Sequence, residues 1–210
     1  MRNFTKLDSI IREIEYGLET VNDKTVSKKS EEFSQNDEIL SKSDNIQSER
    51  IMRVNHMGEV CAQGLYRGQA AFTNDTDTKK QLYKMCQEER EHLKICHGRL
   101  DELGAKASIF NGLWYLSSFT LGAFAGLVQT KYGAGFIKET ERQVSHHLDD
   151  SIQKLPASDL RSREMLGYIK EDEAKHEKTA VEMGSEDIPD AAKESMNLLS
   201  RVMKKITYYI

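Results

Sequence analysis

The feature that most constrains this chain is a repeated Glu-x-x-His motif, each copy of which follows a single glutamate by about 30 residues. A glutamate and a histidine three positions apart lie on one face of an α-helix, so both can bind the same ion. The order Glu, Glu-x-x-His, Glu, Glu-x-x-His is the ligand pattern of a bundle whose four helices direct side chains at two metal ions. The residues that make up this pattern are Glu59, Glu89, His92, Glu141, Glu173 and His176.

The spacing inside the two halves of the pattern is nearly equal. The single glutamate precedes the motif glutamate by 30 residues in the first half and by 32 in the second. Residues at the same height in an antiparallel helix pair are equally far from the turn that joins the helices. The two midpoints are residue 74, inside the polar segment 73–78, and residue 157, beside Pro156. The spacing therefore predicts two helix hairpins, each with its glutamate and its Glu-x-x-His motif at matching height.

Helical phase selects the same residues. Glu89, Glu141 and Glu173 each interrupt an apolar stripe, where an unpaired carboxylate is costly. Glu139, in contrast, shares its face with Lys138 and Arg142 and is predicted to be solvated. The apolar neighbours are Leu82, Met85, Leu93, Cys96 and Leu100 around Glu89, Ile137, Val144 and Leu148 around Glu141, and Leu166, Ile169 and Ala180 around Glu173.

The ligand chemistry of the six residues favours particular metals. Two divalent cations would balance the charge of four glutamates, and neutral imidazoles add none. Oxygen-rich ligation with one histidine per metal suits iron, with manganese as the alternative, whereas zinc and copper prefer sulfur and nitrogen ligands. A plain four-helix bundle with buried, hydrogen-bonded acids is the competing interpretation, but it does not explain the shared spacing.

The composition excludes some classes of protein. With 210 residues, 30% of them charged and only two prolines, the chain suits an all-α domain with an appendage. A net charge of −4 without a basic stripe predicts no nucleic-acid partner. Three cysteines without a C-x-x-C motif indicate a reducing compartment, and the N-terminus lacks the pattern of a secretory signal.

The chain divides into three predicted parts. Residues 1–21 carry a helical apolar stripe and predict an amphipathic helix, which could dock on the bundle, on a partner or on lipid. Residues 22–48 are rich in polar and charged residues and predict a mobile linker. Residues 49–210 are predicted to form the metal-binding bundle.

Two further segments suggest contact with a membrane. Residues 107–130 contain no charge, but their polar residues and glycines, and the need to return the chain to the bundle, favour a long crossover helix over a membrane span. This helix is either buried or partly open to lipid, and its aromatic and glycine content favours lipid. The C-terminus predicts an amphipathic helix with a basic flank, which suits a membrane surface. Its apolar residues are Leu198, Leu199, Val202, Met203 and Ile206, and its basic residues are Arg201, Lys204 and Lys205.

From about residue 48 to the C-terminus the chain resembles the bacterial demethoxyubiquinone hydroxylase family of ubiquinone biosynthesis. The Asn-His-x-Gly-Glu start is the most family-specific part of this resemblance. It implies an all-α, ferritin-like di-iron bundle of two hairpins joined by the uncharged crossover helix, with an N-terminal helical appendage. It also places the metal ligands on the same six residues and suggests His147 as a supporting residue beside the metals, although an ordinary polar position is the alternative. The segments that carry the resemblance are Asn55-His56-Met57-Gly58-Glu59-Val60, Glu88-Glu89-Arg90-Glu91-His92-Leu93, Glu141 with His146-His147, and Asp172-Glu173-Ala174-Lys175-His176.

The resemblance implies a specific reaction. It predicts an O2-dependent monooxygenase with two iron ions that converts 3-demethoxyubiquinol, a polyprenylated benzoquinol, to 3-demethylubiquinol. No nucleotide-binding fingerprint is present, so we expect an external two-electron reductant such as NADH or a protein partner. Peripheral attachment to the cytoplasmic side of the cell membrane and contacts with other ubiquinone-biosynthesis proteins are further expectations. The alternatives are a ferritin-like iron-storage protein, a manganese catalase and a non-catalytic helical scaffold.

Overall fold

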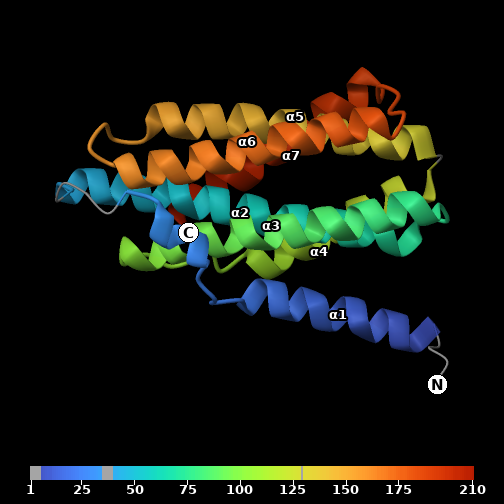
Figure 1. Ribbon diagram of the computed structural model, residues 1–210, viewed down its shortest axis with the longest axis horizontal. Helices are drawn as coiled ribbons and strands as arrows, with labels where there is room; N and C mark the ends of the chain where they lie inside the picture. The colour runs from blue at the N-terminus through green and yellow to red at the C-terminus, as the bar shows by residue number, and fades with distance from the viewer. Residues whose placement is uncertain (1–5, 35–39, 129) are drawn as a thin grey trace.

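The computed structural model describes residues 6–34, 40–128 and 130–210, and within these ranges all regular secondary structure is helical (Figure 1). Four long helices form two antiparallel hairpins that pack against each other. This arrangement confirms the predicted all-α, ferritin-like bundle. The first hairpin consists of α2 (Lys42–Phe72) and α3 (Thr76–Glu102), and the second of α5 (Thr130–Lys154) and α6 (Leu160–Glu182).

The two hairpin turns fall where the spacing of the glutamates predicted them. Asp75 caps α3, because its carboxylate accepts a hydrogen bond from the backbone N–H of Thr78 at 2.7 Å. Asp159 caps α6 in the same way, with the backbone N–H of Ser162 at 3.0 Å. Side-chain caps of this kind satisfy backbone donors that the first turn of a helix leaves unpaired. Both turns are therefore specified locally.

The helix α4 (Asn111–Leu127) returns the chain along the bundle so that α5 can begin at the correct end. It packs closely on α2, and glycines on both helices allow this. A Cβ atom on Gly68 of α2 would lie 2.0 Å from the carbonyl oxygen of Phe119, and one on Gly122 would lie 2.0 Å from that of Leu65. The uncharged segment 107–130 thus contains the predicted crossover helix, although residue 129 lies outside the described residues.

The apolar core consists mainly of two clusters that are separated along the bundle axis. On α2, for example, Met52 belongs to one cluster and Leu65 to the other, with Glu59 between them. The same order holds on α3, α5 and α6, where residues of the two clusters lie on either side of the remaining acids and histidines of the pattern. The four helices therefore hold a polar layer at mid-height, closed above and below by apolar side chains.

The structure corrects the predicted linker 22–48. Residues 35–39 lie outside the described residues, but Lys28–Glu32 form a short 3-10 helix, η1, and the bundle helix α2 already begins at Lys42. Ser41 is the reason for this earlier start, because its hydroxyl caps the helix at the N–H of Asp44. The boundary predicted at residue 49 is therefore seven residues too late.

The segment around η1 is also held in place, which polar composition alone did not predict. The buried guanidinium of Arg161 on α6 donates hydrogen bonds to the carbonyl oxygens of Ser30, Phe33 and Ser34 at 3.0 to 3.1 Å. It also forms an ion pair with Glu102 at 2.6 Å. A single buried cation thus attaches the N-terminal segment to both hairpins.

Two helices flank the bundle. The N-terminal α1 (Lys6–Asn22) lies along the outside of the first hairpin, and α7 (Asp190–Tyr209) packs against α2 (Figure 1). Residues 1–5 of the predicted N-terminal helix lie outside the described residues. Among the helices that the structure describes, none combines the length and the apolar character needed to cross a bilayer.

Candidate metal centre

The structure brings all six residues of the sequence pattern together in the polar layer. They form two overlapping groups whose ligand atoms lie within 4.8 Å of one another. Glu59 and His92 belong to the first group only, and Glu141 and His176 to the second only. The residues shared by both groups are Glu89 and Glu173.

Each of the two shared glutamates lies between the two histidines. One carboxylate oxygen of Glu89 lies 3.2 Å from Nδ1 of His92, and its other oxygen lies 2.9 Å from Nδ1 of His176. The oxygens of Glu173 repeat this arrangement, at 3.4 Å from His92 and 3.3 Å from His176. Each carboxylate therefore presents one oxygen to each half of the site, which is the geometry of a paired-metal centre.

Two acids outside the predicted set fix the orientation of the histidines. Nε2 of His92 lies 3.3 Å from a carboxylate oxygen of Asp172, and Nε2 of His176 lies 3.1 Å from one of Glu88. Each acid belongs to the hairpin opposite its histidine. A carboxylate on the Nε2–H of an imidazole directs the other ring nitrogen at a metal and raises its basicity. Sequence analysis did not identify these roles, although both acids immediately precede a motif glutamate.

Burial makes the centre unfavourable without a cation. It raises the pKa of Glu59 well above the usual value, and the neighbouring charge of Glu89 adds to the effect. Glu141 behaves in the same way, because burial and then the charge of Glu173 raise its pKa. One carboxylate oxygen of Glu141 is buried without a hydrogen-bond partner among the described residues. Four buried acids, with an unpaired carboxylate oxygen on Glu141, fit a site for two cations. The cations would supply the contacts that these carboxylates lack.

The remaining groups form a network of opposite charges. Burial lowers the pKa of His176, but the hydrogen bonds that its imidazole donates to Glu173 and Glu89 outweigh this effect and raise the pKa to about 11. Burial also disfavours the charged form of Glu173, yet hydrogen bonds with His176 and His92 lower its pKa below the usual range. In the absence of metal, the two imidazoles therefore hold protons that bound cations would displace.

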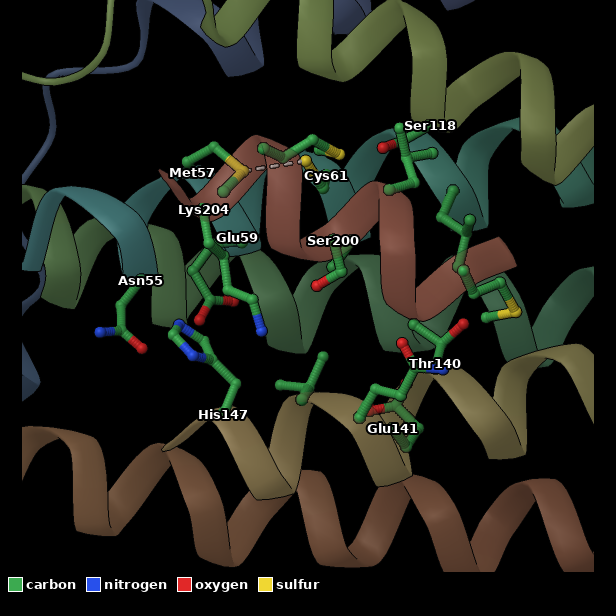
Figure 2. Close-up of a pocket in the computed structure, with 18 of the residues that line it drawn as sticks. Asn55, Met57, Glu59, Cys61, Ser118, Thr140, Glu141, His147, Ser200 and Lys204 are labelled. Atoms are coloured by element: carbon green, nitrogen blue, oxygen red, sulfur yellow. Dashed lines mark hydrogen bonds between the residues drawn. The ribbon is translucent and has the colours of Figure 1, made fainter. Parts of the chain in front are cut away.

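A mostly apolar cavity reaches the centre from one side. It lies between α2, α4, α5 and α7, and the carboxylates of Glu59 and Glu141 form part of its wall (Figure 2). Glu173 of α6 also lines it. Apolar atoms make up most of the wall, and Thr140, Ser200 and Lys204 are among its polar residues. The apolar residues of the wall include Met57, Ala62, Leu65, Leu121, Phe136, Val144, Leu148, Met196, Leu199 and Met203.

His147 lines this cavity but belongs to neither ligand group. It lies between Asn55 and Lys204 in Figure 2, and its Nε2 is buried without a hydrogen-bond partner among the described residues. Burial, followed by the charges of Lys204 and Lys154, lowers its pKa to about 3. A neutral imidazole with an unpartnered, buried nitrogen therefore forms part of the cavity wall.

The opposite side of the centre is polar. A shallow opening between α3 and α6 reaches His92 and is lined by Glu88, Asp172 and Tyr168. Lys84, Gln87 and Glu91 complete its wall. The clustered acids and histidines thus separate an apolar cavity from a charged opening.

One prediction about the acids was wrong. Glu139, expected to be solvated, is buried, because Arg142 donates two hydrogen bonds to its carboxylate at 2.6 and 2.9 Å and Gln143 donates a third at 2.7 Å. The charge of the Glu139 carboxylate is therefore balanced by Arg142, which lies on the same helix, α5. Helical phase still separates it from Glu141, since Glu139 belongs to neither ligand group.

Comparison with known proteins identifies relatives over the whole chain. Residues 46–207 match the family described as ubiquinone biosynthesis protein COQ7. A 3-demethoxyubiquinol 3-hydroxylase of Francisella philomiragia is 41% identical over 209 residues, covering 99% of each chain. The protein of the same name from Xanthomonas axonopodis pv. citri is 40% identical, and the match covers 99% of this chain and 96% of the relative. That from Acinetobacter baylyi is also 40% identical, and the match covers 100% of both chains.

Proposed function

The chain belongs to the family of ubiquinone biosynthesis protein COQ7, and on this basis we propose that it is an O2-dependent monooxygenase that converts 3-demethoxyubiquinol to 3-demethylubiquinol. The observation that carries the proposal is the apolar cavity that ends on the carboxylates of the metal centre. An apolar substrate can reach this centre without crossing the polar side. An iron-storage protein or a catalase needs no such cavity, since its substrates are small and polar.

The six clustered residues would hold two iron ions. Glu59 and His92 would bind one ion, Glu141 and His176 the other, and the carboxylates of Glu89 and Glu173 would bridge them, as their paired oxygens suggest. The oxygen-rich set with one imidazole per ion favours iron. When bound, the metal pair supplies the activation of dioxygen, with electrons from an external two-electron donor such as NADH or a partner protein.

The protein's own contribution is to place the quinol ring and to exclude water. The apolar wall would contact the ring and the start of its isoprenoid tail, so few water molecules remain beside the carboxylates. The unpartnered Nε2 of His147 is available for a hydrogen bond to a ring hydroxyl. Glu88 and Asp172 would act from the polar side, where they keep Nδ1 of each histidine directed at the metals.

A substrate with a long isoprenoid tail resides in a bilayer, so the cavity should open toward one. The exposed apolar residues of α4 and α7 support peripheral attachment of this face to the cytoplasmic side of the cell membrane. They include Leu113, Leu116 and Phe124 on α4 and Leu198, Leu199 and Val202 on α7. Other ubiquinone-biosynthesis proteins would be the natural source of substrate and acceptor of product.

A direct test combines metal analysis with turnover. The purified, iron-loaded protein is supplied with a short-tailed 3-demethoxyubiquinol, O2 and a reductant, and the product is identified by mass spectrometry. We expect one oxygen atom from labelled O2 in the product, and loss of turnover in Glu173→Ala and His176→Ala with helical content retained. Full turnover in either iron-loaded variant would refute the proposal, as would cells that lack the protein yet do not accumulate the one-methoxy quinone.

A further inference from the structure

The N-terminal helix α1 binds the bundle through its polar face. Glu13 accepts two hydrogen bonds from Arg67 on α2, both at 2.7 Å. Tyr16 donates its hydroxyl proton to Gln63, and its ring lies against two guanidinium groups, those of Arg67 at 4.0 Å and Arg90 at 5.3 Å from the ring centroid. Charged and aromatic contacts of this kind orient the helix and do not depend on its apolar residues.

The two flanks of α1 meet different helices. Gly17 faces α4, where a Cβ atom would lie 2.6 Å from the ring of Tyr115. On the other flank, Glu19 forms an ion pair with Arg90 of α3 at 3.3 Å. The rotation of α1 is therefore fixed, with one side toward α4 and an acidic side toward α3.

The apolar stripe of α1 lies on the α4 side and remains exposed. At 100° per residue, its members follow Gly17 around the helix, away from Glu19. Val21, at the end of the stripe, packs against the buried cluster of Val60, Leu93 and Tyr115. The five large aliphatic residues before it are 51 to 64% exposed, and they are Leu7, Ile10, Ile11, Ile14 and Leu18. A helix of a soluble protein normally buries such a stripe.

The helix on the other side of α4 is α7. The indole N–H of Trp114 donates a hydrogen bond to the hydroxyl of Thr207 at 3.2 Å, which joins the two helices. Leu121 of α4 and Leu199 of α7 both line the apolar cavity. The neighbouring helices α1, α4 and α7 thus all carry exposed apolar side chains, and the cavity lies beside α4 and α7.

We infer that α1 is the third element of a bilayer-contacting face, and that its stripe inserts among phospholipids beside α4 and α7. This inference rests on the proposed function, which brings the apolar cavity to a bilayer. A second copy of the chain is a less suitable occupant, because a protein seated on this face would cover the cavity. Basic residues at its far edge, Arg201 and Lys205, match anionic head groups.

The first experiment measures the partition of the full-length protein into vesicles of phosphatidylcholine and phosphatidylglycerol by flotation. The partition coefficient of the variant Ile14→Gln/Leu18→Gln should be at least about tenfold lower than that of the wild type. Each glutamine lacks the favourable transfer of an aliphatic side chain into an apolar medium. The matched control is Leu160→Gln/Val181→Gln, which changes two residues on α6 that are 47 and 52% exposed. The control should partition as the wild type does.

The second experiment locates the helix directly. Leu18→Trp should shift its fluorescence to the blue on addition of vesicles and be quenched by brominated lipid, whereas Val181→Trp should show neither effect. The natural Trp114 contributes the same background to both variants.

Equal partition of the α1 variant and the α6 control would overturn the inference, as would an unquenched tryptophan at position 18. A third outcome would also overturn it: the wild type is a dimer in solution, and the α1 variant is monomeric but binds vesicles as the wild type does. The stripe would then be a contact between two copies of the chain. Wild-type turnover of a short-tailed quinol in vesicle-free buffer tests the proposed function separately. If it is absent while α1 still binds lipid, only the proposed function fails.

Discussion

The two sides of the candidate metal centre differ in polarity. On one side, α2, α4, α5 and α7 enclose an apolar cavity in which the carboxylates of Glu59 and Glu141 are among the few charged groups. On the other side, α3 and α6 present Glu88 and Asp172 at a charged opening. Each histidine directs Nδ1 at the centre and Nε2 at the charged side. Under the proposed function, the polar side positions the metal ligands and the apolar side receives the substrate.

The largest expected effect comes from removing one of the proposed metal ligands. Glu141→Gln should lower metal content and reduce turnover by more than about a hundredfold, since loss of a ligand exceeds loss of an outer partner. The control is Glu139→Gln, a buried acid two positions away whose carboxylate is satisfied by Arg142 and Gln143. Metal analysis and turnover measure both variants. Equal metal content in the two would show that Glu141 is not a ligand.

A change on the polar side should affect the metals but not the substrate. Asp172→Asn replaces the carboxylate that accepts from Nε2–H of His92 with a neutral amide and should weaken metal binding about 10- to 100-fold, with the KM for quinol unchanged. Metal affinity is measured by competition with a chelator. Glu91→Gln is the control, because Glu91 lines the same opening but accepts its hydrogen bond from Ser27. An altered KM without altered metal affinity would contradict the proposed division.

A change on the apolar side should have the opposite signature. Ala62→Leu narrows the cavity and should raise the KM for quinol about tenfold, with metal content unchanged. Ala174→Leu adds the same bulk at an exposed position of α6 and should leave KM as it is. Steady-state kinetics of the two iron-loaded variants decide the matter. A metal-poor Ala62→Leu protein would mean that the cavity wall also shapes the ligand cluster.

The smallest effect concerns pH and distinguishes the metal-free from the metal-loaded protein. His176 has a folded pKa of about 11, above its ordinary value of 6.5, so its stabilising protonation is complete below 6.5 and is lost as pH rises through 11. Glu59 and Glu141 also have raised pKa values, so their protonation likewise stabilises the folded protein, and this contribution is lost as pH rises above 4.5. The melting temperature of the metal-free protein should therefore fall between pH 6.5 and 9, by about 3 °C per pH unit for each proton involved.

The metal-loaded protein should behave in the opposite way, because bound cations need deprotonated ligands and tighten as pH rises. Thermal unfolding with and without chelator measures both slopes. Parallel slopes would contradict the assigned charges.

The sequence was sufficient to predict the hairpins and the six clustered residues. Spacing located both turns near residues 74 and 157, and helical phase separated Glu141 from Glu139. The structure brings the six together, while their role as metal ligands and that of His147 as a supporting residue stay predictions. Glu88 and Asp172 could not be predicted in the same way, because each acts on a histidine of the other hairpin. Such pairing depends on how the hairpins pack, which no local pattern contains.

The N-terminal region shows a different limit of sequence analysis. Polar composition predicted a mobile linker, yet Arg161, more than 120 residues away, accounts for its attachment through three carbonyl groups. The stripe of α1 was correctly identified as helical, but its orientation depends on Arg67 and Arg90. Single buried or partly buried cations therefore decided what composition could not.

The most direct test of the central claim is Mössbauer spectroscopy of the protein reconstituted with 57Fe, together with its iron content. We predict two iron ions per chain in one spin-coupled pair, since Glu89 and Glu173 each offer an oxygen to both positions. A single ion per chain, or two uncoupled ions, would contradict it.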